Sequence, residues 1–285
     1  MSSDDAVHGV SELTLWEQVG GTRLRIRRFT PRPVGRPADA PNDPSQSGLA
    51  VLVPGLGLPR YLLPLARHLA AQGLETVLLD ALAWRGRGRG AGSGRAERAV
   101  PTIAGLSELT AAWLRRQEPG PVVVVGHSTG AQVALEAVLR VQRTRPGLAL
   151  VMGGPTFTPD QRRLRWLVPA ALTSYLKDPP RELVVLKDVA RVRTDLARIV
   201  QSGRRHPTDK RVGLLTVPLT VTAGEADSFA PREWLDLLAS RAGDSSHRAV
   251  LPGSHNNPFT YPELFGALVV EALDRARPGR EDLVR

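Results

Sequence analysis

The sequence contains no cysteine, very few lysines and no long apolar run. Without cysteine the chain cannot form a disulfide or use a thiolate nucleophile, and this composition fits a reducing cytoplasm. No segment approaches the roughly 20 apolar residues that span a bilayer. Residues 1–5 lack the basic and apolar regions of a secretory signal. We therefore expect a cytoplasmic protein with no membrane span.

The scarcity of lysine means that arginine supplies almost all of the positive charge. Lys177, Lys187 and Lys210 are the only lysines among 38 basic residues, and the formal net charge is +10. A basic surface can attract nucleic acid. The arginines are scattered along the chain, however, and many arginines together with abundant alanine, glycine and proline are typical of a GC-rich genome. We predict no nucleic-acid partner.

Short apolar strands alternate with helical segments along most of the 285 residues. An N-terminal hairpin is expected at Gly20-Gly21, between strands at residues 13–19 and 22–29. Alternation of this kind predicts an α/β fold, with a mostly parallel central sheet and helices on both faces. The further predicted strands are residues 49–53, 75–80, 122–125, 148–152, 219–223 and 248–251, and the predicted helices are 61–71, 103–117, 129–141, 231–239 and 262–275.

Two segments depart from this alternation. Residues 31–48 are rich in proline and polar residues, which predicts a mobile surface loop within the core. Residues 155–212 are arginine-rich with helical apolar spacing, which predicts a helical cap over the carboxyl edge of the sheet, where such folds bind ligands. Residues 1–154 and 213–285 then form the core domain.

The pattern Gly126-X-Ser128-X-Gly130 is the most informative motif in the chain. Glycine and serine are common here, so the pattern alone is weak. Its position between a buried valine strand and an amphipathic helix is the setting that a nucleophilic serine on a strand-to-helix turn requires. Such a turn forces its central residue into positive-φ space and leaves no room for side chains at the glycines.

A serine hydroxyl needs a base, and the base needs an anionic partner. Of the six histidines, His255 is the best placed, because it follows the last predicted strand and so lies at the carboxyl edge. Asp227 follows the preceding strand and is the predicted partner, with Glu225 as the competing carboxylate. Ser128, Asp227 and His255 are therefore the candidate catalytic residues.

The order Ser…Asp…His with this turn resembles the α/β-hydrolase superfamily over nearly the whole chain. The resemblance implies an oxyanion hole formed by the backbone N–H groups of Thr129 and Leu56. Family members often have His-Gly in the turn after the third strand, which carries the second oxyanion donor, whereas this chain has Pro54-Gly55-Leu56-Gly57 there. Asp80 matches a common family position that is usually structural, so we assign it no catalytic role.

The resemblance implies a serine esterase-like hydrolase that acts on a small acyl substrate with a carboxylic ester, lactone or thioester bond. A serine at this strand-to-helix turn, the nucleophile elbow of the family, argues against dehalogenase and epoxide hydrolase chemistry, because those enzymes have aspartate there. No metal or organic cofactor is expected. The alternatives are a perhydrolase, lyase or biosynthetic cyclase of the same fold, a carrier-protein thioesterase, and a binding protein without turnover.

The predicted cap suggests how a substrate is chosen. Trp166 and Tyr175 are the candidate substrate-binding residues, because both are large aromatic side chains of this segment. A basic rim on the cap would attract anionic acyl groups or an acidic acyl-carrier protein; the alternative is a solvated helix face. The arginines in question are Arg162, Arg163, Arg165, Arg191, Arg193, Arg204 and Arg205.

Overall fold

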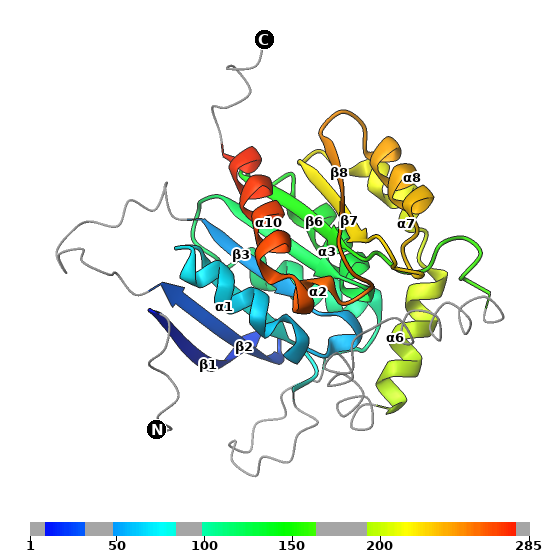
Figure 1. Ribbon diagram of the computed structural model, residues 1–285. Helices are drawn as coiled ribbons and strands as arrows, with labels where there is room; N and C mark the ends of the chain where they lie inside the picture. Colours follow the sequence, from blue (N-terminus) through cyan, green and yellow to red (C-terminus); the bar gives the residue numbers. More distant parts are fainter. Residues whose placement is uncertain (1–8, 32–47, 84–98, 164–192, 278–285) are drawn as a thin grey trace.

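A computed structural model describes residues 9–31, 48–83, 99–163 and 193–277 of the chain (Figure 1). Most of the predicted surface loop, residues 32–47, lies outside these ranges. So do residues 164–192 of the predicted cap, which include Trp166 and Tyr175. The boundaries of the core and cap domains stay predictions.

The described residues form one eight-stranded sheet with the order β1-β2-β4-β3-β5-β6-β7-β8. From β3 onward every neighbouring pair is parallel. The predicted α/β fold with a mostly parallel sheet is confirmed. The strands are β1 Val10–Val19, β2 Thr22–Pro31, β3 Leu49–Val53, β4 Glu75–Asp80, β5 Val122–His127, β6 Leu148–Gly153, β7 Leu219–Gly224 and β8 Ser246–Leu251.

The N-terminal hairpin is the antiparallel part of the sheet. Strands β1 and β2 pair with each other, and β2 pairs antiparallel with β4. Gly20 and Gly21 make the turn with φ of 52° and 83°, a left-handed conformation that glycine adopts without steric cost. At the β2–β4 pairing, Arg25 forms an ion pair with the buried Asp80. This contact agrees with a structural role for Asp80.

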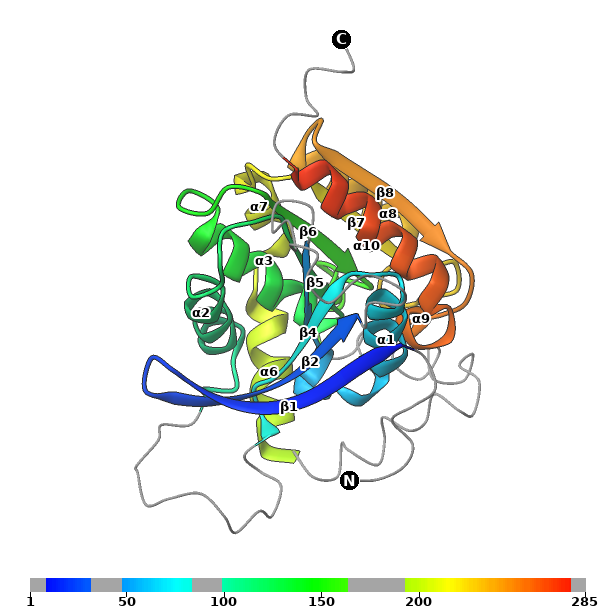
Figure 2. The same ribbon diagram turned by 90° about the vertical axis from the view of Figure 1, so that its left-hand side faces the viewer.

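Helices cover both faces of the sheet (Figure 2). Helices α1 and α10 lie on one face, and α2 and α3 lie on the other. Strands β5 and β6 are buried along their whole length, as expected between two helical layers. The helices are α1 Leu63–Ala71, α2 Ile103–Leu114, α3 Thr129–Val141, α6 Arg193–Arg205, α7 Thr208–Arg211, α8 Arg232–Ala242, α9 Asn257–Thr260 and α10 Pro262–Ala276.

Short 3₁₀ turns precede or follow several helices: η1 Gly55–Gly57, η2 Arg60–Leu62 and η5 Val212–Leu214. The helix predicted from residue 61 begins as η2, and α1 itself starts at Leu63. Pro64 explains this start, because proline lacks an N–H and is tolerated only in the first turn of a helix.

The described part of residues 155–212 contains α6 and α7. Helix α6 packs against α2, α3 and η1, so it lies beside the turn that follows β3. Its burial pattern is one-sided, since Ile199 is buried while Arg198 and Arg205 are exposed. None of the helices in the described ranges is long and apolar enough to cross a membrane.

Candidate active site

The carboxyl edge of the sheet brings together residues that are far apart in the sequence. Strands β5, β6, β7 and β8 run parallel, so their carboxyl ends meet at one edge. Ser128 directly follows β5, Asp227 lies in the loop after β7, and His255 lies in the loop after β8. This edge is where open α/β sheets bind ligands.

Ser128 occupies a strained turn between β5 and α3. Its φ of 58° and ψ of −128° lie outside the regions that a side chain normally permits. The flanking glycines are required by space: a Cβ at Gly126 would lie 2.3 Å from the Gly130 carbonyl oxygen, and one at Gly130 would lie 2.2 Å from the Val53 oxygen. This turn therefore has the positive φ and the two obligatory glycines that the sequence predicts.

Asp227 and His255 form a buried pair. The Asp227 Oδ2 lies 2.9 Å from the His255 Nδ1, and the two residues are 4% and 7% exposed. The other carboxylate oxygen, Oδ1, accepts hydrogen bonds from the backbone N–H groups of Phe229 at 2.9 Å and Ala230 at 3.2 Å. Glu225, the competing carboxylate, has an exposed side chain and is not part of this pair.

Electrostatics keep this carboxylate ionised. Burial acts to raise the pKa of Asp227, but the neighbouring His255 and the N–H of Phe229 outweigh it and hold the pKa below its usual value. An ionised carboxylate can only accept, so the His255 Nδ1 carries the proton. In the neutral imidazole Nε2 is then the acceptor, the form that a general base requires.

Glycines and an aromatic ring bring the pair close to the nucleophile turn. The Ser128 N–H donates to the Gly153 carbonyl at 2.9 Å. A Cβ on the next residue, Gly154, would lie 3.1 Å from both the Asp227 Oδ2 and the His255 ring. The Phe229 ring covers His255 with a centroid distance of 4.7 Å. The three candidate catalytic residues thus surround the same end of β6.

The turn after β3 packs directly on the nucleophile. A Cβ at Gly55 would lie 2.7 Å from the Ser128 Cβ, so only glycine fits there. Leu56 has a φ of 52°, and its backbone N–H donates to the Thr129 Oγ1 at 2.7 Å. The two predicted oxyanion residues are therefore in direct contact. Their role in binding an oxyanion stays a prediction.

Tyr61 and His127 form a second set of polar contacts next to this site, which the sequence did not predict. The Gly55 N–H donates to the Tyr61 Oη at 2.7 Å, and that oxygen lies 2.9 Å from the His127 Nδ1. The His127 Nε2 lies 2.8 Å from the His255 carbonyl oxygen. A carbonyl only accepts, so Nε2 carries the proton and Nδ1 accepts from Tyr61.

This chain of hydrogen bonds joins the turn after β3 to the loop that carries His255. Burial, assisted by the nearby His255, lowers the pKa of His127 to about 3, so this imidazole stays neutral. The position of His127 beside Ser128 was the only signal in the sequence, and nothing there pointed to Tyr61 as its partner.

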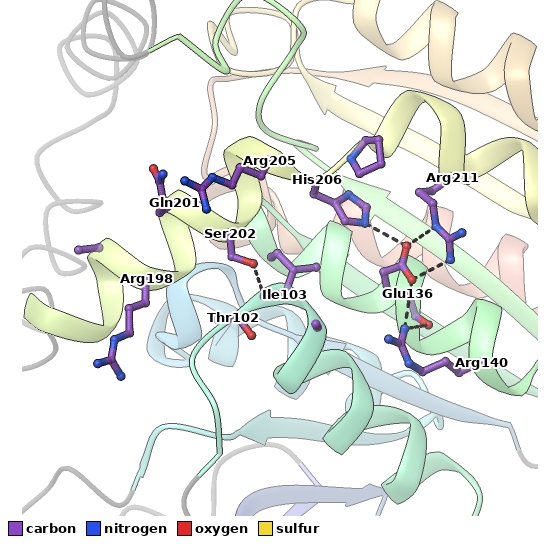
Figure 3. A pocket seen from close by; sticks show the side chains of 13 residues that line it. Thr102, Ile103, Glu136, Arg140, Arg198, Gln201, Ser202, Arg205, His206 and Arg211 are labelled. Atoms are coloured by element: carbon purple, nitrogen blue, oxygen red, sulfur yellow. Dashed lines mark hydrogen bonds and ion pairs between the residues drawn. The ribbon is translucent and has the colours of Figure 1, made fainter.

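A cavity of about 960 Å³ lies between α2, α3 and α6 (Figure 3). Its lining does not include Ser128, Asp227 or His255. Glu136 stands at one end of this cavity, and Arg198 stands at the other (Figure 3). Glu136 accepts from the His206 Nε2 at 3.0 Å, from the Arg211 Nε and Nη2 at 2.6 and 2.9 Å, and from the Arg140 Nη1 at 3.1 Å.

These contacts neutralise the carboxylate. Burial acts to raise the pKa of Glu136, but hydrogen bonds from His206 and Arg211 outweigh it and lower the pKa to about 2. The charge of Glu136 is therefore compensated, whereas Arg198 and Arg205 of the predicted cap add positive charge to the cavity lining. Within the described ranges, no group of three histidine, aspartate or glutamate side chains is arranged to hold a metal ion.

Comparison with known proteins points to one family. The sequence model of the alpha/beta hydrolase family matches residues 50–268. No curated protein sequence matches the chain. The search of solved structures gives many matches of similar fold at low sequence identity, too low to transfer an activity.

Three of these structures illustrate the similarity. An enol-lactonase from Burkholderia xenovorans is 18% identical with a TM-score of 0.64, over 91% of this chain and 100% of that one. An esterase from Exiguobacterium antarcticum is 13% identical with a TM-score of 0.64, over 92% and 100%. The thioesterase domain from the curacin biosynthetic pathway is 15% identical with a TM-score of 0.61, over 92% and 99%.

Proposed function

Since the chain belongs to the alpha/beta hydrolase family, we propose that it is a serine hydrolase that cleaves a carboxylic ester, lactone or thioester through an acyl-enzyme. One observation carries this proposal. Ser128 is held in a strained turn at the sheet edge where the buried Asp227–His255 pair also lies. Strained backbone beside a histidine–carboxylate pair is characteristic of a nucleophile site.

In the proposed reaction, Ser128 Oγ attacks the acyl carbon while His255 Nε2 takes its proton. The carbonyl electron pair moves to oxygen, and the resulting oxyanion is held by hydrogen-bond donors at the contact between Thr129 and Leu56. The carbonyl then re-forms, the bond from the acyl carbon to the leaving group breaks, and His255 gives its proton to that group. Water, deprotonated by His255, attacks the acyl-enzyme in the same way, and the bond from the acyl carbon to Ser128 Oγ breaks to release the acid and restore the serine.

Asp227 would act through His255. It fixes the imidazole with Nδ1 protonated and stabilises the imidazolium that forms when Ser128 is deprotonated. Two backbone N–H groups hold the carboxylate itself in place. No cofactor is needed for this chemistry.

We propose ester-type bonds as the substrate class by analogy with some proteins of the same fold. An enol-lactonase, an esterase and a thioesterase domain share this architecture. A thioesterase acting on carrier-bound acyl groups is the second candidate, favoured by the exposed Arg198 and Arg205 at the cavity beside α6. The basic rim is only partly available, since Arg162 pairs with Asp209 and Arg204 donates to the Arg162 carbonyl.

Fluorophosphonate labelling followed by a substrate panel tests the proposal. We expect the wild-type protein to form a covalent adduct on Ser128 and to turn over p-nitrophenyl esters. Ser128→Ala should lose the label and nearly all activity, leaving the small rate that binding alone supplies. Labelling of Ser128→Ala at the wild-type rate would refute the assignment.

The same panel separates the alternatives. Preference for acyl-CoA over p-nitrophenyl esters of equal chain length would favour the thioesterase. Fluorophosphonate labelling without turnover of acyl-CoA or p-nitrophenyl esters would favour a perhydrolase, lyase or cyclase. No labelling would favour a binding protein. We propose Trp166 and Tyr175 as substrate-binding residues, so their replacement by alanine should change chain-length preference more than the rate on a short ester.

A further inference from the structure

The Leu56 N–H, the amide expected to bind the oxyanion, already has a partner within the protein. It donates to the Thr129 Oγ1 at 2.7 Å. The preceding amide, Gly55 N–H, donates to the Tyr61 Oη at the same distance. Both backbone donors of this turn are therefore used by side chains.

The Thr129 hydroxyl group also has a proton that it can donate. A hydroxyl group carries one proton and two lone pairs, and the Leu56 N–H occupies one lone pair. Among the residues that the structure describes, no acceptor receives the Thr129 hydroxyl proton. Thr129 is 3% exposed, so this proton is also largely withheld from bulk water.

The backbone of the same residue has a second unmatched donor. Thr129 is the first residue of α3, where helical N–H groups lack intrahelical acceptors. No acceptor for its N–H occurs in the described ranges. Thr129 therefore presents two hydrogen-bond donors, an N–H and an O–H, immediately after the nucleophile Ser128.

We propose that the Thr129 side-chain hydroxyl is a donor to the oxyanion, and that the Leu56 N–H acts by polarising this hydroxyl. This inference rests on the proposed function. When Ser128 Oγ bonds to the acyl carbon and its proton passes to His255, the carbonyl oxygen becomes negative. The Thr129 N–H and O–H both donate to that oxygen and keep their protons throughout.

A relay of this kind strengthens the second donor. The Leu56 N–H donates to the Thr129 hydroxyl, and the hydroxyl donates to the oxyanion. The first of these hydrogen bonds draws electron density from the hydroxyl oxygen and makes the hydroxyl proton a better donor. The donor also exists before substrate binds, so little reorganisation is required during reaction. Threonine at this position therefore replaces the direct backbone contact that the family resemblance implies for Leu56.

Thr129→Val and Thr129→Ser separate this role from a structural one. Valine keeps the shape of threonine without the hydroxyl, whereas serine keeps the hydroxyl. With p-nitrophenyl acetate we expect Thr129→Val to lower kcat about a hundredfold with little change in KM, as for loss of one oxyanion donor. Thr129→Ser should stay within a few-fold of wild type.

The matched thionoester, p-nitrophenyl thionoacetate, supplies the decisive comparison. Its reaction places negative charge on sulfur, which accepts hydrogen bonds poorly. Loss of an oxyanion donor should therefore slow hydrolysis of the ester much more than hydrolysis of the thionoester. The ratio of kcat on the ester to kcat on the thionoester should fall at least tenfold in Thr129→Val. Thr110→Val is the control, because it removes a buried threonine hydroxyl of α2 that donates to the Leu106 carbonyl.

Each outcome is informative. Equal losses on the two substrates would mean that Thr129 only holds the turn, and this would overturn the inference. An unchanged or faster Thr129→Val would mean that the hydroxyl merely occupies the site until substrate displaces it, which also overturns it. Failure of the proposed function is seen separately, as a wild-type protein that neither reacts with fluorophosphonate nor turns over the ester.

Discussion

The part of the chain that the structure describes contains two carboxylate–histidine pairs that look alike and differ in their surroundings. Asp227 and His255 lie at the carboxyl edge of the sheet with 2.9 Å between Oδ2 and Nδ1. Glu136 and His206 lie beside the cavity along α6 with 3.0 Å between Oε1 and Nε2. In both pairs the electrostatic surroundings lower the pKa of the carboxyl group.

The neighbours of each carboxylate account for the difference. Glu136 is held by two permanently charged side chains, Arg211 and Arg140, and the second nitrogen of its histidine lies 3.0 Å from the Thr208 hydroxyl. Its charge is therefore already compensated, and both ring nitrogens of His206 have protein partners.

Asp227 has backbone N–H groups and histidine around it, with no arginine contact among the described residues. Its charge is therefore available to stabilise an imidazolium when one forms. A carboxylate–histidine contact alone is therefore not enough to identify a candidate catalytic pair. What distinguishes the two pairs is whether a permanent cation already neutralises the carboxylate.

The strongest test of this comparison removes the charge of Asp227. We expect Asp227→Asn to lower kcat on a p-nitrophenyl ester about ten-thousandfold, because an amide no longer fixes the imidazole tautomer. Glu225→Gln, on the same loop with an exposed side chain, is the control and should keep the wild-type rate. If Asp227→Asn keeps full rate while Glu225→Gln loses it, the acid has been misassigned.

The equivalent change in the other pair should affect stability and leave activity intact. We expect Glu136→Gln to lower the free energy of unfolding by about 2 kcal/mol near neutral pH, because charged hydrogen bonds to Arg211 and His206 are lost. Chemical denaturation measures this loss, and kcat should change less than twofold. Glu108→Gln, at an exposed position on α2, is the control.

The stability that Glu136 contributes should decrease as the pH falls. The pKa of Glu136 falls from its usual 4.5 to about 2 on folding, so its charge stabilises the fold above about pH 4.5. This contribution is lost as pH falls from that value toward 2. The stability difference between wild type and Glu136→Gln should shrink over the same range. A difference that stays constant down to pH 2 would contradict the assignment.

The smallest expected effect concerns Tyr61, whose hydrogen bonds link the turn after β3 to the loop of the candidate catalytic His255. Tyr61→Phe leaves the Gly55 N–H without its acceptor and the His127 Nδ1 without its donor. We expect about a tenfold lower kcat, because small displacements of catalytic groups are costly. Thr76→Val, which removes a buried hydroxyl bonded to the Leu74 carbonyl, is the control. Wild-type kcat with reduced stability would limit Tyr61 to a scaffold role.

Much of the architecture could be predicted because it depends on local pattern. Alternating strands and helices predicted the parallel sheet, and Gly20-Gly21 predicted the hairpin turn. The glycines around Ser128 predicted its strained backbone, since a tight strand-to-helix turn has few sterically allowed forms. The placement of Asp227 and His255 together followed from parallel strands ending at one edge.

The supporting contacts could not be predicted in the same way. Tyr61 and His127 are 66 positions apart, and Glu136 and Arg211 are 75 apart. Hydrogen bonds of this kind depend on which side chains the packed helices and strands bring face to face, and neither spacing nor composition records that.

The sequence by itself determined the fold class, the turn at Ser128 and the order in which Ser128, Asp227 and His255 occur. These follow from backbone sterics and hydrophobic periodicity, which act over short stretches of chain. Only the tertiary structure decided which carboxylate–histidine pair lacks a neutralising arginine and which hydroxyl receives the Leu56 N–H. Those outcomes depend on directional contacts within a few ångströms between distant segments, and such contacts exist only once the core has packed.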